Sequence, residues 1–186
     1  MNEAFEGIQR PIYHNLWVYW LMQLIMLVLI PFNGVVFGIV GLAASIVQLY
    51  EVYAMREVSD GMARAWRWKI VSIVLTLGGL ILTLMAIGSA LAILLLLLTL
   101  AGTIGVLVAS YYFFDGLDDL IPLRGYDFPA GRILWCFWLQ LIGSIVVSLF
   151  RNISPWLGIV VQLVVMAAVL WLLWQYLQAV KAREEA

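Results

Sequence analysis

The chain carries very little charge. Only 11% of its 186 residues are charged, whereas hydrophobic residues make up 65% and the mean hydropathy is +1.04. Soluble domains contain about 25% charged residues, and they need polar groups because much of their surface stays in water. The composition therefore argues against a soluble fold and predicts an integral membrane protein whose first partner is the lipid bilayer.

The residues that build most metal and nucleophilic sites are also scarce. Cys136 is the single cysteine and His14 the single histidine. A disulfide framework, a thiolate metal cage, a zinc site and a histidine-dependent triad therefore lack the residues they need. The net charge of −1 leaves no basic stripe for a phosphate backbone, which argues against nucleic acid as a partner. We expect no cofactor.

Long apolar runs are what the chain has in abundance. A spanning helix needs about 20 mainly apolar residues, and the uncharged run 70–114 is long enough for two, with a turn at 86–90. Turn-forming residues break the other runs at 31–34 and just before Pro155, which is well placed to open a helix. We predict one all-α membrane domain of six transmembrane helices, arranged as three helical hairpins. The predicted spans are 13–31, 34–55, 67–87, 90–114, 132–150 and 155–179, and five spans is the alternative.

The basic residues indicate which way the protein sits. All ten Lys and Arg residues except Arg151 fall on one side of the six spans. Basic loops mark the cytoplasmic side of a membrane protein. The sequence thus predicts a multi-pass protein of a bacterial inner (plasma) membrane, with both termini and nearly all of its polar surface in the cytoplasm.

A similar segment precedes each predicted hairpin. The segments 5–17, 60–68 and 127–135 each mix a basic residue with aromatics, and each hairpin ends in an aromatic-rich helix end. An internal triplication of one hairpin explains this pattern. The Trp and Tyr belts common to multi-pass proteins at membrane interfaces explain it as well, so both interpretations stay open.

Small residues predict where helices approach one another closely. Ala101, Gly105 and Ala109 recur at every fourth position of the fourth span, and Gly143 and Ser144 interrupt the fifth. In lipid, small side chains let helix backbones come into contact. We expect these contacts to form between neighbouring helices of one chain, and a homo-oligomer interface is the alternative.

An acidic cluster follows the fourth span. Asp115, Asp118 and Asp119 would share one face if the helix continued past Phe114. With Asp127 they supply oxygen ligands of the kind that Ca²⁺ and Mg²⁺ prefer. Their spacing is not that of an EF-hand loop. A solvated or salt-bridged loop is the simpler interpretation, so these aspartates are weak metal candidates and no metal site is predicted.

The stretch 59–64, SDGMAR, is similar to part of the CDP-alcohol phosphatidyltransferase signature. In that signature two acids precede D-G-x-x-A-R, two further aspartates follow, and the acids hold metal ions. Here one residue instead of two separates Gly61 from Ala63, and no acid lies between Asp60 and Asp115. Half of the metal ligands are missing, so this enzyme class is not predicted.

Polar residues inside the spans are further candidates. Glu51 lies with Gln48 near the cytoplasmic end of the second span, and an ionisable residue there is a functional candidate by default. It could equally reach the interface and pair with an arginine, which is the interpretation we favour. Deeper glutamines are suited to hydrogen bonds between helices; they are Gln23, Gln140 and Gln162. The loops add Arg64, Arg67, Asp127 and Arg132.

No catalytic constellation emerges from these residues. We therefore predict a non-enzymatic protein with a structural, regulatory or accessory role, which acts through its cytoplasmic loops on a membrane-protein partner or within a homo-oligomer. One alternative is a small transporter or channel with a cytoplasm-open cavity lined by Glu51 and the glutamines. Another is a metal-dependent, lipid-active enzyme that uses the acidic loop.

Overall fold

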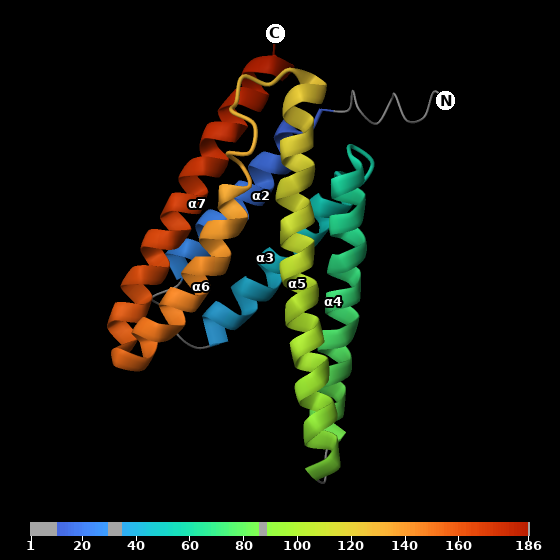
Figure 1. The fold of residues 1–186 in the computed structure, drawn as a ribbon, viewed down its shortest axis with the longest axis vertical. Coiled ribbons are helices and arrows are strands. Elements are labelled where there is room, and N and C mark those ends of the chain that lie inside the picture. Colours follow the sequence, from blue (N-terminus) through green and yellow to red (C-terminus); the bar gives the residue numbers. More distant parts are fainter. Residues whose placement is uncertain (1–10, 30–34, 86–88, 186) are drawn as a thin grey trace.

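The structure, a computed structural model, describes residues 11–29, 35–85 and 89–185. Within these ranges the protein is all-helical and has no strand, which confirms the all-α part of the predicted fold class (Figure 1). The helices are α2 (Tyr13–Leu29), α3 (Val35–Ala54), α4 (Asp60–Met85), α5 (Ser89–Arg124), α6 (Trp135–Ile153) and α7 (Pro155–Glu184).

The helices associate as sequential pairs. α2 contacts α3, α4 contacts α5 and α6 contacts α7, while contacts between the pairs are fewer and mainly join α2 to α7. In Figure 1 the α4–α5 and α6–α7 hairpins turn at one end of the molecule, and the last turns of α7 lie at the other. We call the end that holds the last turns of α7 the core end, and the opposite end the distal end.

The hydrophobic core lies at the core end. Each helix contributes buried side chains to it, among them Leu16 of α2, Met62 of α4 and Leu117 of α5. Toward the distal end, large apolar side chains instead point outward, and Leu97 and Val164 are 56% and 65% exposed. Apolar exposure on this scale is expected of a surface that contacts lipid rather than water.

Three of the described helical segments are long and apolar enough to cross a membrane. They are Leu95–Arg124, Trp135–Ile153 and Pro155–Glu184. The α2 helix is also apolar but has only 17 residues. These segments fit the predicted membrane protein, and a total of six spans stays a prediction.

Two helices run well beyond their predicted spans. α4 begins at Asp60 instead of residue 67, and α5 continues to Arg124 instead of ending at 114. Hydropathy marks where a chain leaves lipid, whereas a helix continues as long as one face is buried. Leu117 and Leu120 are fully buried on this extension of α5. The helix ends before Gly125, whose φ of +66° is the left-handed conformation typical of the residue after a helix.

The other helix boundaries differ from the predicted ones by a few residues. Pro155 occupies the start of α7, as expected from its fixed φ and missing N–H. The predicted break at 31–34 and most of the turn at 86–90 lie outside the described residues, and so does the first part of the segment 5–17, residues 5–10. The internal triplication therefore stays a prediction.

The predicted row of small residues in α5 is partly correct. Gly105 and Ala109 are buried, and a Cβ on Gly105 would lie 3.0 Å from the Cβ of Ser72 in α4. Ala101 is exposed, and the buried position next to it is Gly102. A straight helix turns every 3.6 residues, so a strict four-residue repeat drifts off the contact face. The observed row follows a mixed spacing of three and four.

In α6 the two small residues have different environments. Gly143 is buried against α7, where an added Cβ would meet a side-chain methyl of Val165 at 2.5 Å. Ser144 is exposed. The expected contact within the chain is thus confirmed for Gly143, and Ser144 lies on a different face of the helix.

Candidate functional site

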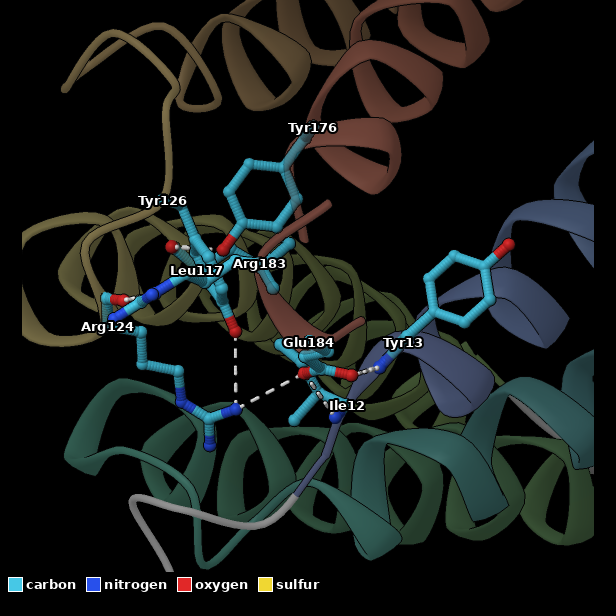
Figure 2. A network of polar contacts seen from close by, with 8 residues as sticks. All are labelled: Ile12, Tyr13, Leu117, Arg124, Tyr126, Tyr176, Arg183 and Glu184. Atoms are coloured by element: carbon cyan, nitrogen blue, oxygen red, sulfur yellow. Dashed lines mark hydrogen bonds and ion pairs between the residues drawn. The ribbon is translucent and has the colours of Figure 1, made fainter. Parts of the chain in front are cut away.

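A polar network at the core end ties together the two ends of the described chain (Figure 2). Glu184, at the end of α7, accepts hydrogen bonds from the backbone N–H groups of Ile12 at 2.9 Å and Tyr13 at 3.1 Å. The Nη1 atom of Arg124 lies 3.5 Å from Oε1 of Glu184. The first N–H groups of a helix have no partner within it and favour a negative charge. Glu184 therefore caps α2 from the far end of the sequence.

The same network fastens the end of α5. The hydroxyl of Tyr176 donates to the carbonyl oxygen of Leu117 at 2.7 Å, and Nε of Arg183 donates to that of Arg124 at 3.1 Å. Arg124 also donates to the hydroxyl of Tyr126 at 3.2 Å. Burial raises the pKa of Tyr126, an effect that the Arg124 guanidinium beside it opposes. These groups hold α5 and α7 together, so their role in this structure is to stabilise the fold.

The acidic cluster is also partly used by the fold. Because α5 continues past Phe114, Asp118 lies on a helix, and its Oδ1 accepts the backbone N–H of Gly131 at 2.7 Å. This bond fastens the loop 125–134 to α5. Asp115 is half-buried and Asp119 is exposed. In the part of the chain that the structure describes, no group of three or more His, Cys, Asp or Glu is placed to hold a metal ion.

Glu51 is buried within the protein. Its side chain is 5% exposed, and Oε2 accepts a hydrogen bond from Nδ2 of Asn15 at 2.6 Å. A buried carboxylate needs a donor, and Asn15 supplies one across the α2–α3 pair. Among the described residues its observed partner is therefore an asparagine and not the expected arginine. Gln48, one turn earlier, is half-buried.

The remaining candidates lie on the surface of the core end. Arg64 and Arg67 are exposed on α4, and Asp127 and Arg132 are exposed on the loop after α5. The Arg64 guanidinium lies 5.6 Å from the centre of the Tyr112 ring. Guanidinium groups are attracted to aromatic faces at such distances, so Arg64 is held in place yet open to a partner.

In the described part of the chain, two cavities lie away from these residues. The smaller encloses about 40 Å³ and is lined by Tyr19, Lys69 and Ser72, among others, which is room for one or a few water molecules. The larger, about 370 Å³, is a groove between α6 and α7 that we call the α6–α7 groove. Its lining residues are Gln140, Gly143, Ser144, Val147, Ser148, Arg151, Gln162, Val165 and Met166. Neither cavity is lined by Glu51 or Gln48.

The predicted hydrogen bonding of the deep glutamines is seen for Gln162. Its Oε1 accepts a bond from Nη2 of Arg151 at 2.9 Å and so links α6 to α7. Gln23 instead donates to the hydroxyl of Tyr19 within α2, at 3.3 Å. The cap formed by Glu184 was not predicted, because nothing near Glu184 in the sequence points to the start of α2.

Comparison of the chain with known protein families, with curated proteins and with solved structures finds no match. Functional inference therefore depends on the geometry of this chain alone.

Proposed function

We propose that the protein is a non-enzymatic accessory protein of a bacterial inner membrane that binds a membrane-protein partner through its core end. In this proposal all six helices span the membrane, and the core end with both termini lies in the cytoplasm. The observation that carries the proposal is that some charged groups are used within the fold while others are exposed at the surface. Glu51, Asp118 and Glu184 hold elements of the fold together, while a separate set of charges is exposed.

The proposed orientation rests on the distribution of basic residues. Arg64, Arg67 and Arg132 are exposed at the core end. The guanidinium of Arg64 lies near the Tyr112 ring of α5, and that of Arg132 lies near the Phe128 ring of the loop that follows. Arg151 lies near the distal turn between α6 and α7. Cytoplasmic segments of membrane proteins are enriched in Lys and Arg, which supports a cytoplasmic core end.

The proposed contact surface consists of Arg64, Arg67, Asp127 and Arg132. Arginine is the basic residue best suited to contacts with carboxylates, because its planar guanidinium donates two parallel hydrogen bonds. Asp127 adds an opposite charge at the same end of the molecule. Such a mixed charged surface favours a partner with complementary charges and makes binding sensitive to salt.

Site-specific photo-cross-linking in cells tests this proposal. A photoreactive phenylalanine analogue in place of Arg67 or Asp127 is expected to give an adduct with a protein of one defined mass. The same analogue in place of the lipid-facing Val164 is the matched control and is expected to give none. Adding Arg64→Glu should reduce the adduct at least several-fold while leaving expression unchanged, because a reversed charge repels the partner's carboxylates.

Two outcomes would contradict the accessory role. One is the absence of a protein adduct at both core-end positions. The other is solute flux in proteoliposomes that the substitution Glu51→Gln abolishes. The burial of Glu51 is the observation that favours this transport alternative, since an ionisable residue inside a membrane protein often lies on a substrate or ion path.

A further inference from the structure

The α6–α7 groove is a polar surface inside an apolar region. Arg151, Ser148, Ser144 and Gln140 line it and follow one another along α6 at spacings of three and four residues. With a rise of about 1.5 Å per residue, this row is about 16 Å long. It begins near the distal end of α6 at Arg151 and reaches about the middle of a hydrocarbon core roughly 30 Å thick.

Among the described residues, the groove is lined by α6 and α7 alone. At the core end, the same face of α6 meets α5, where the rings of Phe137 and Tyr111 lie 5.4 Å apart. Helical periodicity places Ser144 and Ser148 on the face of Phe137. The two hairpins diverge toward the distal end (Figure 1), and α5 makes few contacts with α6. Ser144, Ser148 and Arg151 are accordingly exposed.

Outside the groove, large apolar side chains near the distal turn of α6 and α7 are exposed. Leu149 is 61% exposed, Ile153 75% and Trp156 74%. In a bilayer these side chains contact lipid, so lipid molecules are the ones that reach the groove. Acyl chains cannot satisfy hydrogen-bonding groups. The Ser144 hydroxyl donates to the carbonyl oxygen of Leu141 at 2.7 Å, but the Arg151 guanidinium has five N–H donors and calls for a ligand with polar atoms.

Arg151 is well placed to hold an anion at the mouth of the groove. Its Nη2 atom donates to Gln162 at 2.9 Å, which orients the guanidinium and leaves further N–H donors for a ligand. Its backbone is fixed as well, because Gly158 brings the first turn of α7 so close that an added Cβ would lie 3.0 Å from the Cα of Arg151. Arg151 lies close to the distal end of α6, at the depth expected of lipid headgroups.

We propose that the α6–α7 groove binds one anionic phospholipid from the leaflet at the distal end. The phosphate pairs with Arg151, because a guanidinium matches the oxygens of a phosphate with two parallel hydrogen bonds. Ser148 lies deeper in the groove and donates a hydrogen bond to an ester oxygen of the glycerol region. Ser144, deeper still, exchanges its hydrogen bond to the carbonyl oxygen of Leu141 for one to a second ester oxygen. An acyl chain packs along Val147, Val165 and Met166, the apolar part of the lining.

Thermal unfolding of the purified full chain in a neutral detergent tests the proposal. Phosphatidylglycerol added as mixed micelles is expected to raise the melting temperature of the wild type by roughly 5 °C or more, since a ligand bound to the folded state alone stabilises it. Phosphatidylcholine and inorganic phosphate at equal concentrations are expected to have little effect. Arg151→Gln, which keeps an amide to face Gln162, should lose most of the phosphatidylglycerol shift.

Two further variants separate binding from folding. Ser144→Leu fills the groove without removing charge, and it should lose the shift while its melting temperature without lipid stays close to that of the wild type. Arg132→Gln removes an exposed arginine at the core end, and it should keep the full shift. An equal shift in Arg151→Gln, a shift produced by inorganic phosphate alone, or no shift in the wild type would each overturn the proposal.

Discussion

Replacement of Gly61 by alanine is expected to lower the melting temperature of the protein by about 6–12 °C. A Cβ on Gly61 would lie 2.5 Å from the Cα of Gly116 and 2.7 Å from its N, so the backbones of α4 and α5 must move apart. Overpacking of a tight contact costs about 1–3 kcal/mol and occasionally more. At a backbone-to-backbone contact we expect the upper end, about 3 kcal/mol, which for a protein of this size corresponds to the stated shift.

The same α4 helix offers a matched control. An added Cβ on Gly78 would meet nothing within 4 Å, so Gly78→Ala introduces no clash. Alanine favours the helix over glycine by about 1 kcal/mol, and the melting temperature is expected to stay constant or rise. Gly116→Ala, on the other side of the contact, should behave like Gly61→Ala. Equal melting temperatures for Gly61→Ala and Gly78→Ala would show that α4 and α5 do not meet at Gly61 and Gly116.

The second large effect is expected for Glu184→Ala, which removes the cap that α7 supplies to α2. The substitution removes the acceptor of the N–H groups of Ile12 and Tyr13, and it removes a carboxylate that lies 3.5 Å from Arg124. The side chains of Arg124 and Glu184 are only 9% and 18% exposed. Loss of one partner from such a pair is expected to cost about 3 kcal/mol, which thermal unfolding would register as a drop of about 6–12 °C.

The adjacent residue provides the control for this prediction. Glu185 is 67% exposed and lies 3.7 Å from Lys181, one helical turn away. An exposed pair of this kind is worth about 0.5 kcal/mol or less, so Glu185→Ala should move the melting temperature by no more than about 2 °C. A similar effect of the two substitutions would mean that Glu184 does not fasten α7 to α2.

The helices were predictable because each is long, apolar and separated from the next by turn residues or charge. Their full lengths were not, since the extension of α5 as far as Arg124 depends on Leu117 and Leu120 being buried by other helices. A hydropathy profile detects apolar segments that contact lipid, but it does not show which residues other helices bury. The charged segment after Phe114 therefore looked like a loop although it forms the last turns of a helix.

The polar contacts of the site were harder to predict because most of them join distant segments. Glu184 meets Ile12 at a separation of 172 residues, and Asn15 meets Glu51 at 36. Nothing in local spacing selects these partners. Two features could be predicted from the local sequence. Pro155 was expected at the start of α7, and Gln162, which lies deep in a predicted span, was expected to find a hydrogen-bond partner on a neighbouring helix.

The central claim is that the three hairpins cross the membrane from a cytoplasmic core end. Cysteine labelling in spheroplasts tests it most directly, in a Cys136→Ser background that keeps a donor near the carbonyl oxygen of Val169. Single cysteines in place of Asn152, Asp127 and Glu185 would be exposed to a membrane-impermeant maleimide. We predict that residue 152, at the distal turn, reacts in intact spheroplasts, and that residues 127 and 185 react only after lysis. Labelling of residues 152 and 127 from the same side would contradict the claim.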